Sequence, residues 1–399
     1  MSYFQGLFQK IFALILLTTL VSAQNTAPAS TDQKKPGTQQ EPTPAAGGPQ
    51  GDTGPIAVPK KNPDQQAPKV EPKPPKVKNP AGLEDYSIQV SSQLVTVPIS
   101  VVTKEGQFIP GLKADNFRVF EDGVEQKVSK MELTDAPITA VMLLEFSSPN
   151  FRVNQQIYGA FMYDMFNAAY GFAQSLKKED WVAVVSYDMK PTTVVDFTQD
   201  KRQVFAALNS MQIPMRSDSN VFDALYDTID RLEGLDGHKY ILLVGSGIDT
   251  FSKLNLDKVL AKLKTTRDIT LYTISTGWAA REYYDSRGAF NRDPTINLTY
   301  LQADNQMRSF AQLTGGRFYQ PRFTSEIPGI MFDIAQTVRN QYMVYYRPTN
   351  PSLDGSYRKL KVELKAPDGG PLTVQSEKGK KLKYQVIYRE GYRARQVVE

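Results

Sequence analysis

Residues 139–150 read Thr-Ala-Val-Met-Leu-Leu-Glu-Phe-Ser-Ser-Pro-Asn, an apolar run that ends in oxygen-bearing side chains. The run predicts a buried strand, and Glu145, Ser147 and Ser148 follow where a helix is expected to begin. Loops next to two further predicted strands add Ser219, Ser246 and Asp249. Because ligands of open α/β sheets bind at the carboxyl ends of the strands, we expect these oxygens to meet in one crevice. Oxygen ligands of this kind suit a divalent cation such as Mg²⁺ or Mn²⁺.

The first 83 residues differ in composition from the rest of the chain. Lys10 precedes the apolar run 11–21 and the small residues Val21-Ser22-Ala23, which predicts a secretory signal peptide over 1–23, cleaved after Ala23. Residues 24–83 are rich in Pro, Gln and Lys, and predict a disordered linker that acts as a spacer or binds anionic envelope polymers through its Lys-Pro repeats. The chain has no Cys, so disulfides and a lipid-anchored cysteine are excluded.

Localisation and charge follow from these segments. The apolar run is shorter than the ~20 residues that span a bilayer, so we expect a secreted or periplasmic protein without a transmembrane segment after signal cleavage. The net charge is +5, of which Lys10 contributes one unit and residues 24–80 contribute three. Residues 81–399 therefore carry a net charge near +1, which argues against nucleic acid as a partner.

Residues 84–395 fall into three predicted segments. Residues 84–136 alternate apolar and polar side chains and predict antiparallel strands. Residues 137–340 alternate short apolar strands with amphipathic helices, which predicts a doubly wound, mostly parallel sheet covered on both faces. Residues 341–395 return to β character and are expected to pack with 84–136 in a small antiparallel β-sandwich, because neither set of strands closes a core alone.

The α/β segment divides into definite elements. Predicted strands cover 140–146, 181–187, 193–197, 240–244, 269–275 and 317–320. Predicted helices cover 153–176, 201–211, 221–232, 256–266, 305–314 and 325–338.

Residues 276–304 are left as a long predicted loop on the crevice side of the sheet. Long loops in compact domains are often functional, and aromatic and Arg side chains are enriched at protein interfaces. We predict that this loop, together with Ser148, contacts a partner; an alternative is a lid packed over the protein's own sheet. The loop residues concerned are Trp278, Arg281, Tyr283, Tyr284, Arg287, Phe290, Arg292 and Tyr300.

Three stretches resemble the metal motifs of the von Willebrand factor A domain family. Leu143 to Ser148 stands where that family carries Asp-x-Ser-x-Ser. Ser219 to Leu225 resembles the segment that opens with the metal-binding Thr, and Leu243 to Thr250 resembles the strand that ends in Ser-Asp-Gly-x-Asp. Residues 84–395 as a whole resemble a group of secreted bacterial proteins with such a domain, through motifs that include Phe108 to Leu112, Phe117 to Gly123, Asp180 to Val185, Thr314 to Phe318 and Arg339 to Tyr342.

The resemblance implies a Rossmann-like domain with a metal-ion-dependent adhesion site. In that site two Ser and a Thr hold Mg²⁺ or Mn²⁺, two Asp hold bound waters, and a carboxylate of the partner completes the shell. Carried over to this chain, Ser147 is kept and Ser219 replaces the Thr. Glu145 replaces the first Asp, Pro149 replaces the second Ser, and Ser246 replaces the second Asp.

Two carboxylates have therefore shrunk to one, which predicts weak or lost metal binding. The candidate degenerate metal site comprises Glu145, Ser147, Ser219, Ser246 and Asp249, and Asp249 or Asp218 is the residue placed to restore charge. A second interpretation is that the serines cap helices and hydrogen-bond one another across the crevice.

These observations predict a secreted or envelope-associated protein-interaction or adhesion module that is not an enzyme and needs no cofactor. Its partner is expected to be a protein in the cell envelope or the extracellular space. The competing hypothesis is a Mg²⁺-dependent adhesion module with a variant metal site, and a hydrolase is a remote third. Catalysis is disfavoured because His238 is the only His and lies in a turn remote from Ser147.

Overall fold

The computed structural model describes residues 94–104, 106–133, 137–147, 155–211, 218–375 and 379–394. The expected signal peptide, the expected linker and Ser148 lie outside these ranges, so what the sequence predicts for them stays a prediction. Among the helices of the described ranges, none has both the length and the apolar composition needed to cross a bilayer.

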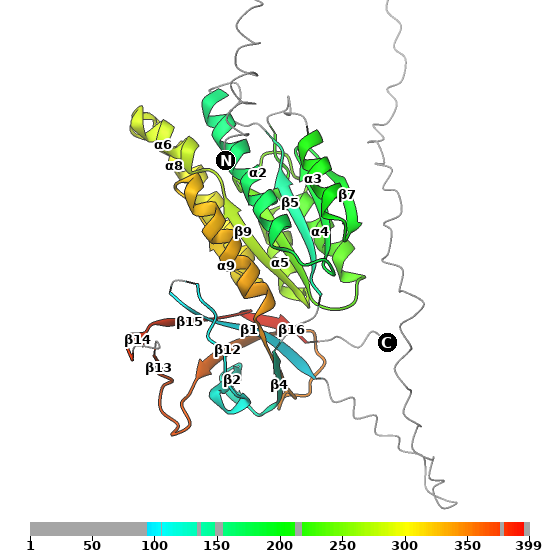
Figure 1. The fold of residues 1–399 in the computed structure, drawn as a ribbon, viewed down its shortest axis with the longest axis vertical. Helices are drawn as coiled ribbons and strands as arrows, with labels where there is room; N and C mark the ends of the chain where they lie inside the picture. The colour runs from blue at the N-terminus through cyan, green and yellow to red at the C-terminus, as the bar shows by residue number, and fades with distance from the viewer. Residues whose placement is uncertain are drawn as a thin grey trace, which may run out of the picture. The chain divides into compact units, whose positions relative to one another are not determined.

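A six-stranded sheet forms the centre of the α/β part, with the strand order β10-β9-β8-β5-β6-β7 (Figure 1). Its strands are β5 (Thr139–Glu145), β6 (Trp181–Tyr187), β7 (Pro191–Thr198), β8 (Lys239–Gly245), β9 (Ile269–Ser275) and β10 (Phe318–Tyr319). Neighbouring strands pair in parallel except β6 and β7, which are antiparallel. The sheet is mostly parallel, as the uninterrupted apolar runs predicted.

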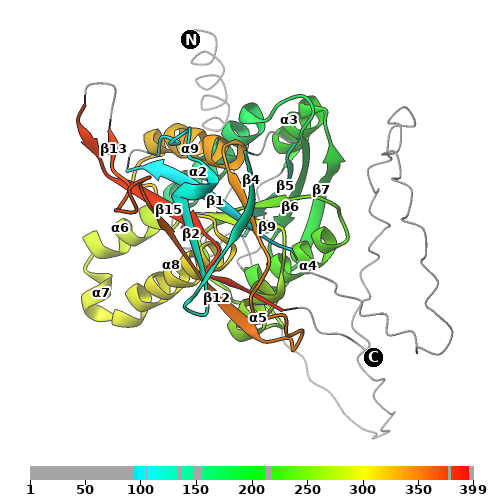
Figure 2. The same ribbon diagram turned by 90° about the horizontal axis from the view of Figure 1, so that it is seen from below.

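Helices cover both faces of this sheet (Figures 1 and 2). Met142 and Leu144 of β5 point to the face covered by α2 (Gln155–Ser175), α3 (Lys201–Ser210) and α9 (Ile327–Arg339). Val141 and Leu143 point to the opposite face, which is covered by α4 (Val221–Glu233), α5 (Leu256–Thr265) and α8 (Pro294–Thr314). Successive side chains of a strand point to opposite faces, so one apolar strand supplies two cores. The predicted α/β fold is confirmed.

The predicted long loop at 276–304 is wrong, because most of this segment is helical. It contains α6 (Trp278–Ser286), α7 (Ala289–Arg292) and the first half of α8, which begins at Pro294 rather than at Asn305. The Asp293 side chain caps α8 by accepting a hydrogen bond from the Thr295 backbone N–H at 3.0 Å, and Pro294 takes the first helical position. The early turns of α8 are largely exposed, so they lack the apolar spacing on which the prediction relied.

Strands from the two ends of the described chain combine in two four-stranded antiparallel sheets. Their orders are β15-β1-β11-β4 and β16-β12-β2-β3. The strands are β1 (Val95–Thr103), β2 (Phe117–Glu121), β3 (Val124–Gln126), β4 (Val128–Leu133), β11 (Tyr342–Tyr346), β12 (Tyr357–Leu364), β15 (Tyr384–Tyr388) and β16 (Gly391–Arg393). In the first sheet, Ile99 of β1 lies opposite both Tyr342 and Tyr388. A shared apolar core lies between the two sheets, so the predicted sandwich is confirmed.

A buried ion pair joins β12 and β2, which are neighbouring strands of the second sheet. Arg358 donates to Glu121 Oε1 at 2.8 Å, and each of the two side chains is only 2% exposed. The other carboxylate oxygen accepts hydrogen bonds from the hydroxyls of Tyr346 at 2.6 Å and Tyr392 at 2.7 Å. A buried carboxylate is tolerated here because both of its oxygens have donors.

The sandwich contacts the α/β part beside the turn that precedes β9. Arg389 donates to the Thr266 carbonyl oxygen at 2.6 Å, and Arg267 donates to the Arg393 carbonyl oxygen at 2.8 Å. Gly315, which ends α8 with φ 81°, also lies here, and a Cβ added to it would lie 2.7 Å from the Arg389 backbone nitrogen. These contacts are at the amino ends of the parallel strands. The sandwich therefore does not cover the carboxyl ends, where the predicted site lies.

Substitution of Gly316 tests how closely the backbone packs at this end of the sheet. A Cβ added to Gly316 would lie 2.1 Å from the Leu271 carbonyl oxygen, whereas a Cβ on Gly329 in α9 would meet nothing within 4 Å. We expect Gly316→Ala to lower the free energy of unfolding by ~3 kcal/mol, the upper end for overpacking. The control Gly329→Ala is expected to raise it by ~0.5 kcal/mol through helix propensity. Urea denaturation measures both, and equal stabilities of the two variants would contradict the packing described.

Candidate functional site

The carboxyl ends of β5 and β8 bring four side chains together. Glu145 is the last residue of β5, and Ser246 follows the last residue of the neighbouring strand β8. Ser147 lies two residues beyond Glu145, and Ser219 lies just before α4. The four side chains are buried, with exposures between 0% and 4%. We call Glu145, Ser147, Ser219 and Ser246 the crevice cluster.

The carboxylate of Glu145 is the centre of the crevice cluster. Its Oε1 accepts hydrogen bonds from Ser147 Oγ at 2.6 Å and from Ser246 Oγ at 3.0 Å. Its Oε2 accepts a hydrogen bond from the Ser246 backbone N–H. Both oxygens are therefore directed at donors of the protein itself.

Gly245 makes room for this arrangement at the end of β8. A Cβ at this position would lie 2.5 Å from Glu145 Oε2 and 2.6 Å from the hydroxyl oxygen of Tyr187. A carboxylate and a phenol thus occupy the space that any other residue would fill. Tyr187 ends β6, directly beside Glu145 in the sheet, and was not among the site residues predicted from the sequence. Tyr187 is placed in the site by the parallel pairing of β5 with β6, and that pairing cannot be read from the sequence.

Burial dominates the electrostatics of the crevice cluster. Loss of solvent raises the pKa of Glu145 above its usual range, although the hydroxyls of Ser147, Ser246 and Ser219 and the Ser246 N–H each act to lower it. Burial, with the charges of Glu145 and Asp249 nearby, raises the pKa of Tyr187 well above its usual value. The environment therefore favours neutral forms of both groups.

Asp249 does not hydrogen-bond to the crevice cluster. Its Oδ1 accepts hydrogen bonds from Ser252 Oγ at 2.5 Å and from the Phe222 backbone N–H at 3.4 Å, in the first turn of α4. Asp218, the other acid expected to restore charge, accepts a hydrogen bond from Thr250 Oγ1 at 3.4 Å. Both carboxylates therefore hold the loop after β8 and the start of α4 in place.

The residues present do not fit a hard divalent cation. Mg²⁺ requires an oxygen shell with enough negative charge to replace its water, and the one carboxylate here already accepts three hydrogen bonds. Ser219 Oγ and Tyr187 Oη are buried without a hydrogen bond of good geometry to any described residue, but neutral hydroxyls add no charge. Within the ranges that the structure describes, no three His, Cys, Asp or Glu side chains gather as ligands.

The helical segment 278–304 begins at the carboxyl ends of the parallel strands, the same end of the sheet as the crevice cluster. Thr276, the residue after β9, donates its backbone N–H to the Gly245 carbonyl oxygen at 3.0 Å. Asp304 fixes the far end of the segment by accepting hydrogen bonds from Arg281 at 2.6 Å, from Gln320 at 2.8 Å and from Ser275 at 2.9 Å. The role of Asp304 is not apparent from the sequence, because its donors come from three different parts of the chain.

The predicted partner-binding residues of this segment differ in exposure. Arg287 and Arg292 are exposed, whereas Trp278, Arg281, Tyr283, Tyr284 and Phe290 are partly buried, and Tyr300 is only 5% exposed. Tyr300 packs with Ala280 in a small apolar cluster that supports the segment. Arg287 lies 4.3 Å from the centroid of the Tyr283 ring. The segment therefore presents guanidinium groups on a support of its own aromatic rings.

Comparisons with known proteins bear on residues 155–305, which match the family model of the von Willebrand factor type A domain. No curated protein sequence matches the chain. Among similar solved structures, the vWF domain of the type V pili tip protein Mfa5 from Porphyromonas gingivalis is 12% identical, with coverage of 52% of this chain and 96% of that one and a TM-score of 0.37. The conserved hypothetical protein BatB from Bacteroides thetaiotaomicron is 10% identical, with coverages of 51% and 100% and a TM-score of 0.35.

Proximal thread matrix protein 1 from the mussel byssus is also similar, with 13% identity and a TM-score of 0.37. The match covers 52% of this chain and 49% of the mussel protein, so the chain spans about half the length of that protein.

The raised pKa of Glu145 predicts a definite pH dependence of stability. The folded state holds the proton more tightly than the unfolded state, so wild-type stability falls as pH rises above the unfolded pKa of about 4.3 toward the folded pKa. Glu145→Gln lacks this proton. Its amide oxygen can still accept from the Ser246 N–H, and the Ser147 and Ser246 hydroxyls can turn to accept from the amide nitrogen.

We therefore expect the melting temperature of Glu145→Gln, relative to wild type, to increase between pH 4.5 and pH 8, where it is expected to equal or exceed that of wild type. Differential scanning calorimetry in EDTA measures this difference. The opposite slope, with wild type gaining relative stability as pH rises, would show that the folded protein favours the ionised carboxylate.

Proposed function

We propose that the chain, whose residues 155–305 match the family model of the von Willebrand factor type A domain, is a protein-interaction module that binds its partner without a bridging divalent cation. The observation that supports this proposal is the hydrogen bonding of Glu145, whose two oxygens accept from Ser147 and Ser246. A carboxylate of the partner would then have no cation in the crevice whose coordination shell it could complete. Recognition then rests on the groups exposed around it.

The helical segment 278–304 is the binding surface that we propose. Arg287 and Arg292 are exposed there, and the nearby apolar side chains Leu298 and Leu301 of α8 are 52% and 45% exposed. Arg and large apolar side chains are the kinds of group that dominate protein interfaces. The attachment of the segment through Asp304 holds it in one arrangement, which lowers the entropy lost on binding.

The proposed setting is the cell envelope or the extracellular space. It rests on the signal peptide predicted over 1–23 and on the Pro-rich composition of 24–83, which suits a spacer between a cell layer and the folded domains. The near-neutral charge of residues 81–399 is consistent with a protein partner rather than a nucleic acid.

Calorimetric titration tests the absence of a bridging cation. Mg²⁺ and Mn²⁺ are titrated at millimolar concentrations into the full chain and into Ser147→Ala, which removes one candidate ligand. We expect no saturable heat from either protein, because the only carboxylate of the crevice cluster is already hydrogen-bonded. Saturable binding to wild type that is lost in Ser147→Ala would instead establish the Mg²⁺-dependent adhesion module.

Retention of an envelope protein on the immobilised full chain tests the binding surface. We expect the double variant Arg287→Ser, Arg292→Ser to retain about tenfold less of the partner, the effect of losing ~1.4 kcal/mol at an interface. Arg202→Ser is the matched control, since Arg202 lies on α3 with a side chain 90% exposed. EDTA should leave retention unchanged. Release of the partner by EDTA, or equal retention by the double variant and the control, would contradict the proposal.

A further inference from the structure

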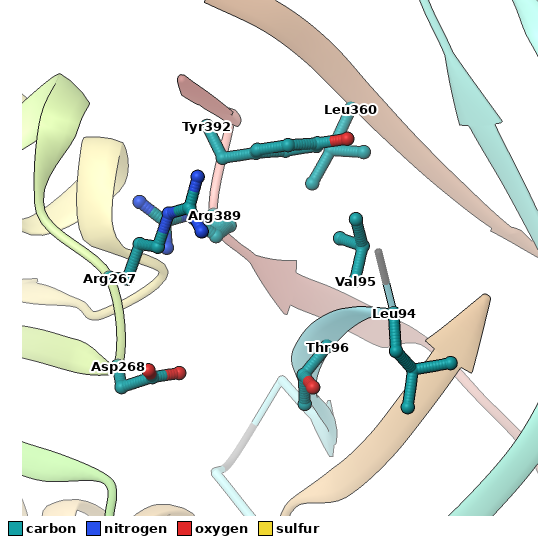
Figure 3. Close-up of a pocket in the computed structure, with 8 residues that line it drawn as sticks. All are labelled: Leu94, Val95, Thr96, Arg267, Asp268, Leu360, Arg389 and Tyr392. Atoms are coloured by element: carbon teal, nitrogen blue, oxygen red, sulfur yellow. The ribbon is translucent and has the colours of Figure 1, made fainter. Parts of the chain in front are cut away.

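A small pocket lies at the opposite end of the sheet from the crevice cluster, where the sandwich meets the α/β part (Figure 3). Its volume is about 160 Å³. It is lined by Leu94, Val95, Thr96, Arg267, Asp268, Leu360, Arg389 and Tyr392. The lining residues come from the beginning of β1, from the turn before β9 and from the C-terminal strands, so both parts of the fold contribute.

Arg389 is the most unusual group in the lining. It is only 7% exposed, and its guanidinium donates to the Gly391 carbonyl oxygen at 2.8 Å and to the Thr266 carbonyl oxygen at 2.6 Å. Within the described ranges, no carboxylate forms an ion pair with it. Burial lowers the pKa of Arg389 below its ordinary value, and the negative charge of the exposed Asp268 opposes this shift only in part. An anion in the pocket would therefore add a favourable partner for this guanidinium.

A second guanidinium strengthens this preference for an anion. Arg267 and Arg389 lie side by side on one wall of the pocket in Figure 3, and the charge of Arg267 contributes to lowering the pKa of Arg389. Asp268 is exposed beside them and is the one acid in the lining. The side chains that line the pocket therefore carry a net charge of about +1 at neutral pH, because the guanidinium groups stay protonated.

The other wall of the pocket is apolar. Val95, Leu360 and Tyr392 are between 5% and 8% exposed, and the Tyr392 hydroxyl donates to Glu121 at 2.7 Å, away from any ligand. Only the ring of Tyr392 therefore remains for contact with a ligand. A pocket of this size is similar to a cavity of ~150 Å³ that holds benzene. It has room for one short apolar group next to a single anionic group.

We propose that this pocket binds a carboxylate attached to a short apolar group. The carboxylate pairs with Arg267 and Arg389, the geometry that planar guanidinium groups favour, and the apolar group packs on Val95, Leu360 and the Tyr392 ring. Asp268, at the rim, is placed to accept a hydrogen bond from an ammonium group next to the carboxylate. The ligand is a free small acid or amino acid, or the C-terminal residue of a peptide. This proposal does not depend on the proposed function of the crevice.

Calorimetric titration of the full chain with three probes tests the pocket. Isovalerate carries the carboxylate and an alkyl group, leucine adds an ammonium group, and N-acetyl-glycyl-valine presents a peptide C-terminus. We expect saturable binding of at least one probe and a loss of about tenfold or more in affinity in Arg267→Gln. Arg267 is chosen because it is partly exposed and its hydrogen bond to the Arg393 carbonyl oxygen is exposed, whereas the hydrogen bond of Arg389 to the Thr266 carbonyl oxygen is buried and its loss endangers folding. Arg308→Gln, an exposed Arg on α8 outside the pocket, is the matched control.

Asp268→Asn distinguishes the sources of the ligand. Tightest binding of leucine, weakened by Asp268→Asn while isovalerate binding is unchanged, identifies an amino acid. Tightest binding of the acetylated dipeptide identifies a peptide C-terminus, and tightest binding of isovalerate identifies a simple acid; all three support the shared proposal. Failure of all three probes to bind wild type at millimolar concentration, or equal affinities for wild type and Arg267→Gln, overturns it.

Discussion

The carboxylate of Glu145 is the constraint on which the crevice depends. It is removed from water, and it keeps its place because two serines and a backbone N–H donate to it. The two neighbouring strands accommodate this carboxylate. Gly245 of β8 has no side chain, and the phenol of Tyr187 of β6 fills the remaining space. A glutamate at the end of a central strand thus fills the crevice with a side chain whose oxygens are hydrogen-bonded to the protein itself.

The two ends of the parallel sheet differ in electrostatic character. At the carboxyl ends, the Glu145 carboxyl is surrounded by neutral hydroxyls, and Asp249 is held by the loop and by α4. At the amino ends, Arg267 and Arg389 lie together where the sandwich packs against the turn before β9. The sandwich therefore supplies half of a positively charged pocket that neither part of the fold forms alone.

Most of the fold could be predicted from the sequence, because the central strands are continuous apolar runs. Strands 181–187 and 269–275 have the bounds that the pattern predicted, and both sets of flanking strands pair as expected. The start of α8 was missed because its exposed turns are stabilised by a cap rather than by an apolar stripe. In the crevice, strand order brings Glu145 and Ser246 together, but the direction of Asp249 and the presence of Tyr187 depend on contacts distant in sequence.

The sandwich is assembled from strands that lie at both ends of the described chain. Strand β1 pairs with β11 and β15, so partners are separated by well over two hundred residues. The ribosome releases the N-terminal strands long before their partners, and loop closure over such a distance makes the pairing a late step. Until β11 and β15 have been synthesised, both edges of β1 are unpaired and prone to aggregation. A chain truncated before β11 lacks both of these partner strands. Chaperone demand during biogenesis should therefore concentrate on this N-terminal segment.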